Sequence, residues 1–284
     1  MQHNDYILTV SCPDRTGIVY RVSGLLFEFG CNILDSQQFG DEETGRFFLR
    51  VHFDLPQSVT PATLRERLLA LSAEFGMDSQ LHDARAKPRL LIMVSRQGHC
   101  LNDLLFRVRS GYLHAEIAAI VSNHPDFAAL AQSYDIPFHH LPVTPETKAA
   151  QEAQILKIVA EQRIDLVVLA RYMQVLSPAM CKALAGRAIN IHHSFLPSFK
   201  GARPYHQAHQ RGVKIIGATA HYVTSDLDEG PIIEQDVERV DHTMSAQELT
   251  QVGSDIESLV LARAVRSHVE QRILLNGTRT VVFR

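Results

Sequence analysis

Two different arrangements of apolar residues meet near residue 86 of the 284-residue chain. Before that point, apolar residues either alternate with polar ones or recur at helical spacing. These patterns predict strands at residues 6–11, 32–40, 46–55 and 78–83, and helices at residues 18–29 and 61–75. The resulting order, β-α-β-β-α-β, is that of a split βαβ sandwich, a ferredoxin-like fold.

After residue 86 the strands become apolar along their whole length. Runs of this kind lie at residues 89–95, 116–122 and 165–170, with helical patterns between them at 102–109, 126–134 and 146–162. Further strands are predicted at 188–192, 217–223 and 232–237, followed by a long helix at about 245–274. Buried strands that alternate with helices indicate a mostly parallel, Rossmann-like sheet covered on both faces. We therefore expect an α/β protein with domains at 1–86 and 87–284.

Composition narrows the class of protein and its compartment. Lys and Arg total 28 against 31 Asp and Glu, so the net charge of −3 gives no basic field for nucleic acid. The longest run without a charged residue, at 188–199, has 12 residues, too few to span a membrane. The N-terminus lacks a secretory pattern, and the four cysteines are scattered without a CxxC, as in reduced cytosolic proteins. We expect a cytoplasmic protein without nucleic-acid or membrane partners.

One spacing suggests chemistry at a carbonyl group. Asn190 and His192 are two residues apart, so in a strand they lie on the same face. An amide donor beside an imidazole suits a carbonyl oxygen that becomes an oxyanion, and Asp228 is placed to hold the imidazole or a water. The set lacks a Ser or Cys nucleophile, which favours direct attack by water or an amine. In the alternative interpretation, both residues are strand-end polar groups satisfied by loop backbone.

Other chemistries have weaker support in the sequence. The chain has 15 histidines, but HExxH and the spacings of structural zinc sites are absent, so we expect no metal. Ser194 and Cys100 lack the nucleophile-elbow pattern and are interpreted as a loop hydroxyl and a buried thiol. Gly98 stands alone, which supports neither a dinucleotide fingerprint nor a P-loop.

Several ordered motifs resemble the formyltransferase family that uses 10-formyltetrahydrofolate. These are residues 190–192, 194–197 and 221–231, together with 170–178, which resembles the family's folate-binding loop. The resemblance covers about residues 88–284 and implies that folate is a substrate, with no cofactor and no metal. It implies a catalytic set of Asn190, His192 and Asp228, and folate contacts from Met173, Val175, Leu176, Thr224, Ser225 and Asp226. It also predicts a cis peptide at Leu196–Pro197.

The first segment resembles an ACT domain, with the motif at residues 14–18 opening its first helix. This combination resembles the formyltetrahydrofolate deformylase family, hydrolases of one-carbon metabolism linked to purine biosynthesis. Residues 97–101 favour water as the acceptor, because bulky His99 and apolar Cys100 reduce the backbone donors available to a substrate phosphate. The alternatives are a folate-dependent formyl transfer to an amine and a non-catalytic folate sensor, against which the intact catalytic set argues.

The ACT resemblance implies regulation and assembly. ACT domains pair side by side, so we expect a homo-oligomer whose interface includes the first 85 or so residues. An amino-acid effector is expected at the loop of Asp14, Arg15, Thr16 and Gly17. There Gly17 would allow close backbone approach, and Asp14 would pair with an α-amino group. The alternative for Asp14 is a helix cap.

Overall fold

A computed structural model describes residues 4–194 and 204–284 and separates into two compact units. One unit joins the chain up to Ala86 with Glu270–Arg284, and the other comprises Lys87–Val269. Each is described by itself. Among the described residues, no helix combines the length and apolar character that crossing a membrane requires.

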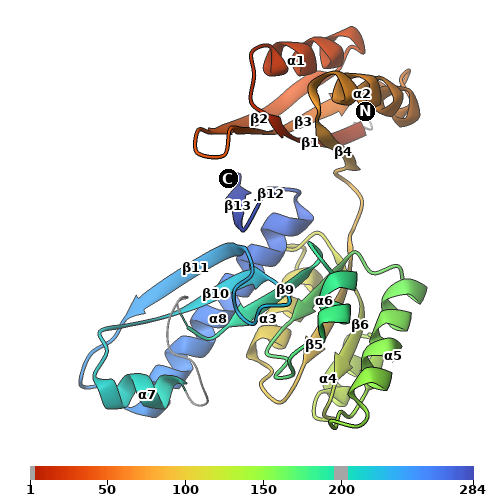
Figure 1. Ribbon diagram of the computed structural model, residues 1–284. Helices are drawn as coiled ribbons and strands as arrows, with labels where there is room; N and C mark the ends of the chain where they lie inside the picture. The colour runs from red at the N-terminus through yellow and green to blue at the C-terminus, as the bar shows by residue number, and fades with distance from the viewer. Residues whose placement is uncertain (1–3, 195–203) are drawn as a thin grey trace. The chain divides into compact units, whose positions relative to one another are not determined.

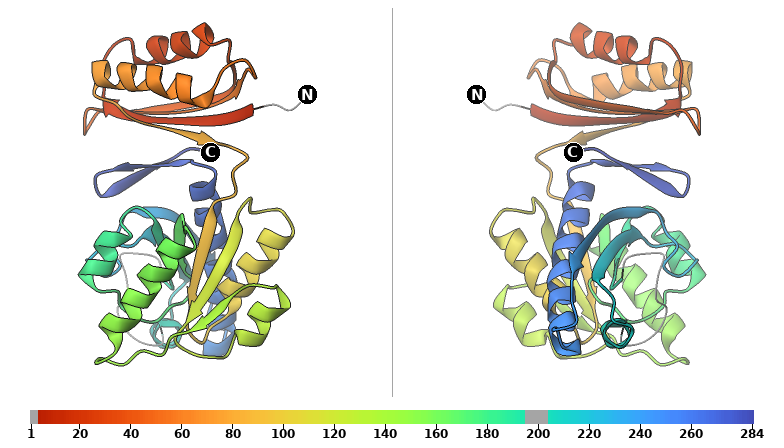
Figure 2. Two further views of the ribbon diagram at one scale, coloured as in Figure 1. Left: turned by 90° about the vertical axis from the view of Figure 1, so that its right-hand side faces the viewer. Right: turned by 90° about the vertical axis from the view of Figure 1, so that its left-hand side faces the viewer.

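The first unit is an antiparallel sheet with two helices on one face (Figures 1 and 2). Its elements are β1 (Asn4–Pro13), α1 (Ile18–Glu28), β2 (Asn32–Asp41), β3 (Arg46–Leu55), α2 (Pro61–Phe75) and β4 (Asp78–Asp83). The strand order β2-β3-β1-β4 is that of the predicted split βαβ sandwich. Residues of β3 alternate between two cores, because Phe47 and Leu49 pack with the helices whereas Phe48 belongs to a cluster on the other face.

A C-terminal hairpin completes this second face. Strands β12 (Ile273–Asn276) and β13 (Arg279–Val282) pair with each other, and Leu274 and Phe283 pack with Phe48 of β3. The sequence pattern places these residues in the second domain and predicts that its last helix extends to about residue 274. The structure instead ends the helix at Val269 and groups residues 270–284 with the first unit.

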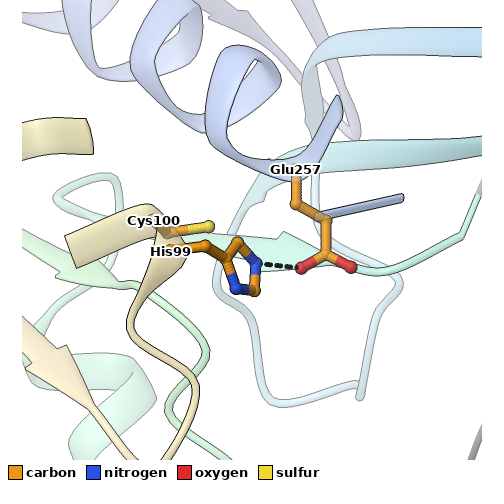
Figure 3. A group of neighbouring side chains, drawn as sticks. All are labelled: His99, Cys100 and Glu257. Atoms are coloured by element: carbon orange, nitrogen blue, oxygen red, sulfur yellow. Dashed lines mark hydrogen bonds and ion pairs between the residues drawn. The ribbon is translucent and has the colours of Figure 1, made fainter. Parts of the chain in front are cut away.

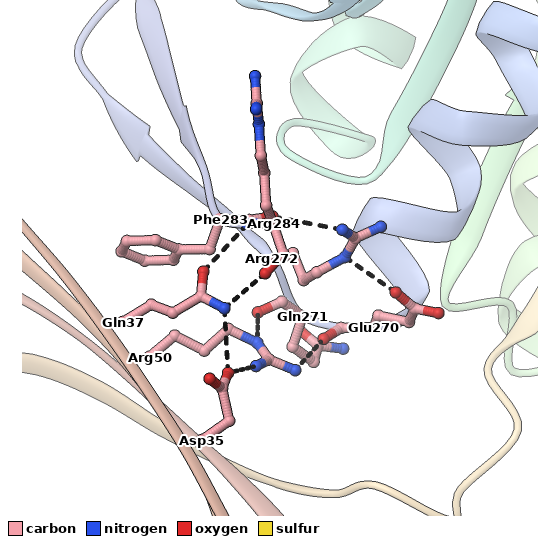
Figure 4. Close-up of polar contacts among 8 residues, drawn as sticks. All are labelled: Asp35, Gln37, Arg50, Glu270, Gln271, Arg272, Phe283 and Arg284. Atoms are coloured by element: carbon pink, nitrogen blue, oxygen red, sulfur yellow. Dashed lines mark hydrogen bonds and ion pairs between the residues drawn. The ribbon is translucent and has the colours of Figure 1, made fainter.

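Arg50 of β3 holds the start of this C-terminal segment (Figure 4). Its guanidinium, 7% exposed as a residue, donates to the backbone carbonyls of Gln271 and Glu270, each at 3.1 Å, and pairs with Asp35 at 3.2 Å. A buried cation with three acceptors is stable only while those acceptors stay in place. The two backbone contacts therefore link β3 to a segment more than 200 residues away in sequence.

We predict that Arg50→Met destabilises the first unit and releases the hairpin. The variant keeps the apolar stem but leaves two partly buried carbonyls without their charged donor, at a cost of about 2–4 kcal/mol. Urea unfolding measures the loss, and hydrogen exchange at Thr280 and Val281 reports the hairpin directly. Arg85→Met, which removes an exposed surface pair, is the control. Equal stability of both variants would contradict the role assigned to Arg50.

The second unit is a seven-stranded sheet with helices on both faces (Figure 2). Its strands are β5 (Arg89–Val94), β6 (Glu116–Ser122), β7 (Phe138–His140), β8 (Leu166–Leu169), β9 (Ala188–His192), β10 (Ile215–Tyr222) and β11 (Ile232–Arg239). Its helices are α3 (His99–Arg109), α4 (Ala128–Ser133), α5 (Lys148–Glu161), α6 (Pro178–Ala183), α7 (Pro204–Arg211) and α8 (Ala246–Val269). The sequence pattern does not predict β7, α6 and α7, because each of these elements has too few residues to show a clear strand or helix periodicity of apolar positions.

Strand order explains where the site lies. The order is β11-β10-β9-β8-β5-β6-β7, in which β7, β6, β5, β8 and β9 are parallel and β10 and β11 are antiparallel additions. The chain leaves β5 in one direction to form β6 and later returns on the other side as β8. In such sheets, ligands bind beyond the carboxyl ends of the strands at this switch point.

Candidate active site

The three predicted catalytic residues meet at the end of β9. Asn190 and His192 lie on one face of that strand, and Asp228 reaches them from the loop after β10. His192 Nδ1 lies 3.2 Å from Asp228 Oδ1. Nε2 of His192 is buried and has no hydrogen-bond partner among the described residues. The imidazole thus has one nitrogen on the carboxylate and the other available for a ligand.

His221 joins this group, although it was not among the predicted site residues. Antiparallel pairing places His221 of β10 opposite Asn190. Its Nδ1 lies 2.9 Å from the carbonyl oxygen of Tyr222, which can only accept, so Nδ1 carries the proton. In the neutral ring, Nε2 then accepts from Asn190 Nδ2 at 3.3 Å. His221 therefore fixes the orientation of the Asn190 amide, with the amide nitrogen toward the His221 ring.

The carboxylate of Asp228 remains ionised in this setting. The hydrogen bond from His192, together with the neighbouring His221 ring, holds the pKa of Asp228 well below its ordinary value, against the opposing effect of burial. The residue has a positive φ of 59°, a left-handed conformation that Asp tolerates better than most residues. Two residues on, a Cβ at Gly230 would collide with the carbonyl of Tyr222, so only glycine lets this loop lie against β10.

A cavity of about 330 Å³, here called the first cavity, opens over these groups. All nine residues predicted for catalysis and folate binding line it: Asn190, His192, Asp228, Met173, Val175, Leu176, Thr224, Ser225 and Asp226. They come from β9 and from the loops after β8 and β10. A partly apolar hollow whose lining includes a carboxylate and an imidazole fits a ring-containing substrate with a reactive carbonyl.

The predicted folate contacts differ in exposure. Met173 and Val175 are 58% and 57% exposed, so their side chains are free to cover a planar ligand. Leu176, at 9%, already packs in the core and offers only an edge to the cavity. The loop backbone is anchored, because Ser95 Oγ accepts from the Met173 N–H at 2.9 Å and donates to Asn123 Oδ1 at 2.7 Å.

A second cavity of about 470 Å³ adjoins the first and shares Arg171, Met173, Gln174 and His193 with it. Burial lowers the pKa of His193 to about 4, and the charge of Arg171 adds to this effect. His193 is therefore neutral at physiological pH.

The only described group with metal-ligating side chains in reach of one another is His99, Cys100 and Glu257, beside the second cavity (Figure 3). Two features make it unsuited to a cation. Burial raises the pKa of the Cys100 thiol far above its ordinary value, which disfavours the thiolate form that ligates metals. The Glu257 carboxylate already has the Arg171 guanidinium 3.3 Å away.

The predicted effector loop is engaged in local packing. Gly17, with φ 97°, begins α1 without a side-chain cap, so the helix-cap alternative for Asp14 is wrong. The guanidinium of Arg15 lies over the Phe75 ring at 3.9 Å. The predicted cis peptide at Leu196–Pro197 lies outside the described residues.

Known families account for both units. The protein-family model of the ACT domain matches residues 4–82, and the protein-family model of formyl transferase matches residues 88–265. A formyltetrahydrofolate deformylase of Corynebacterium sp. strain P-1 is 50% identical over 281 residues, 98% of each chain. The crystal structure of a formyltetrahydrofolate deformylase from Burkholderia mallei is 53% identical with a TM-score of 0.95, covering 99% of this chain and 100% of that one. A glycinamide ribonucleotide transformylase from Symbiobacterium toebii is 28% identical with a TM-score of 0.65, covering 70% of this chain and 95% of its own.

An ACT domain is thus joined to a formyl transferase domain in this chain. The transformylase resembles only part of this chain, whereas the deformylases match it along nearly their full length. The chain belongs to the formyltetrahydrofolate deformylase family.

Proposed function

We propose that this protein hydrolyses 10-formyltetrahydrofolate to formate and tetrahydrofolate. The observation that carries the proposal is the first cavity, where every residue predicted for catalysis and for folate binding lines one hollow. Family membership supports the same reaction. 10-Formyltetrahydrofolate itself is the substrate, and the reaction needs no second folate and no cofactor.

The geometry supports a direct attack of water on the formyl carbon. Asn190 Nδ2 donates to the formyl oxygen with its second hydrogen, since His221 takes the first. His192 donates to the same oxygen from Nε2 in its protonated form, which the Asp228 carboxylate stabilises across 3.2 Å. Asp228 orients the attacking water. As the new C–O bond forms, one proton of the water passes to the Asp228 carboxylate. The tetrahedral intermediate then collapses: the C–N bond breaks, that proton is delivered to the leaving nitrogen, and formate and tetrahydrofolate are released.

One assay tests this function against transfer to an amine. Purified protein is incubated with 10-formyltetrahydrofolate alone, and formate and tetrahydrofolate are followed. We expect equal amounts of both without any added acceptor. Formation of tetrahydrofolate only when an amine is supplied would support the transferase instead.

The exposed apolar side chains of the first cavity should set affinity for folate. We predict that Val175→Asp raises KM roughly tenfold with little change in kcat, because a charge replaces about 1.5 kcal/mol of apolar contact. Phe106→Asp, at another exposed apolar position of the second unit and outside both cavities, is the matched control. Steady-state kinetics of the two variants separate the cases, and an unchanged KM for Val175→Asp would remove that residue from the binding site.

We further propose that the protein is a cytoplasmic homo-oligomer and that it is regulated through its ACT domain. A hydrolase that discards formyl groups would waste them unless it responded to one-carbon supply, on which glycine and methionine report. We expect an amino acid to change activity through the loop of Asp14, Arg15, Thr16 and Gly17. Activity is measured against single amino acids with the full chain and with Asp14→Asn, and mass by light scattering. A monomer indifferent to every amino acid would leave the domain without the proposed role.

A further inference from the structure

Two adjacent histidines lie at the end of strand β9, and their rings are in contact. While a strand continues, the side chains of neighbouring residues point to opposite faces. Here β9 ends at His192, so His193 is the first residue beyond the strand. The two imidazole rings stack, with 4.7 Å between their centroids and 23° between their planes. His192 therefore has a second aromatic ring against its face, in addition to the Asp228 carboxylate at its Nδ1 atom.

The contact that His193 makes in the described protein is through the face of its ring. Its Nε2 atom is buried and has no hydrogen-bond partner among the described residues. The residue lines both the first and the second cavity, so its ring lies where the two cavities meet. A substitution that removes Nε2 but keeps a flat ring therefore breaks no hydrogen bond at this atom.

The ring of His193 is neutral throughout the physiological pH range. Burial, followed by the charges of Arg171 and His192, lowers the pKa of His193 to about 4. The charges of Glu257 and Asp228 act in the opposite direction but are outweighed. His193 therefore presents an uncharged aromatic surface to His192.

A proton that enters this pair of rings is held by His192. Two imidazolium charges in stacked rings would repel each other, so the pair binds one proton at a time. The Asp228 carboxylate, 3.2 Å from His192 Nδ1, attracts that proton to His192. His221 lies 3.7 Å from the same carboxylate but does not compete, because its Nε2 accepts from Asn190. A cation against the face of a neutral aromatic ring is attracted by its π electrons, so the stacked ring favours protonated His192.

We propose that His193 is a positioning residue for His192: its neutral ring fixes the plane of the catalytic imidazole and stabilises the imidazolium that donates to the formyl oxygen. This inference rests on the proposed hydrolysis, because that reaction requires a proton on His192 Nε2. His193 acts through His192 and has no contact of its own with the formyl group.

The test compares two variants that differ in the aromatic face. His193→Phe keeps a flat, neutral ring, whereas His193→Leu is apolar and of comparable size but has no ring. We expect kcat to stay within about twofold of the unmodified protein in His193→Phe and to fall roughly three- to tenfold in His193→Leu, with little change in KM. The limb of the kcat profile on which the rate falls as pH rises should move down by about half a pH unit in His193→Leu, because the imidazolium loses its support.

Nuclear magnetic resonance measures the same effect without turnover. In protein with carbon-labelled histidine rings, the signal of His192, assigned by its loss in His192→Gln, reports the pH at which this ring loses its proton. We expect that pH to fall by about half a unit in His193→Leu and to stay unchanged in His193→Phe. His242→Leu, which removes an exposed histidine outside both cavities, is the control and should alter neither kcat nor the titration.

Equal losses in His193→Phe and His193→Leu would show that the nitrogen is needed and not the ring face, and would overturn the proposal. So would a His193→Leu variant in which either kcat or the titration of His192 is unchanged. If His193→Leu does not fold, His193→Met takes its place, and loss of folding in both assigns the ring to stability and overturns the proposal as well. The titration needs no substrate, so failure of the unmodified protein to hydrolyse 10-formyltetrahydrofolate would count against the proposed function and remain distinguishable from these results.

Discussion

Asp228→Asn should lower kcat for hydrolysis by roughly 10²–10⁴-fold, the usual contribution of a general acid–base group. The amide keeps the size of the side chain, but it cannot take a proton from water or stabilise the imidazolium of His192 across 3.2 Å. Folate binding should persist, because the six predicted folate contacts are untouched. Steady-state kinetics with a separate measurement of folate affinity check both statements.

The matched control is Glu229→Gln, which removes the adjacent exposed carboxylate, one that does not line the first cavity. Near-normal turnover by Asp228→Asn, or an equal loss in the control, would remove Asp228 from the mechanism.

The pH profile provides a second check on Asp228. Its pKa is held well below the ordinary value, so the group is already ionised throughout the range above about pH 4. Any acid limb of the rate profile near neutrality must then come from another group. Since the folded pKa is the lower one, ionised Asp228 stabilises the folded protein above its unfolded pKa, and this contribution is lost as pH falls through the folded pKa. Asp228→Asn should flatten the acid side of the stability curve.

Asn190→Ala should cost about 10²–10³-fold in kcat, with a small change in KM. The lost amide is the donor aimed at the position where negative charge develops, and removal of one such donor has this effect in other enzymes. In the structure, His221 holds the amide in that orientation at 3.3 Å. A variant at the orienting residue, His221→Ala, should therefore show a smaller loss in the same direction. If Asn190→Ala raises KM and leaves kcat unchanged, the amide binds the ground state and not the transition state.

Local sequence patterns were sufficient to predict the two folds and the central residues of the site. Strand alternation before residue 86 and unbroken apolar runs after it distinguish an antiparallel sheet from a parallel one, because helices cover both faces of a parallel sheet and make its strands apolar along their whole length. The spacing of Asn190 and His192 places them on one face of a strand, as the structure shows. The motifs around these two residues, including the loop of Asp228, are short stretches of sequence. Their order along the chain can be seen without a structure.

Long-range packing determined the remaining features. His221 meets Asn190 through the register of an antiparallel pair, which no local period specifies. Glu257 reaches His99 from 158 residues away, and in sequence it is simply one more acidic residue on an amphipathic helix. The hairpin at 270–284 covers β3 because Leu274 and Phe283 need an apolar partner and Phe48 supplies one. A hydrophobic pattern shows which residues will be buried, but the partner against which each is buried depends on the free energy of the whole assembled unit.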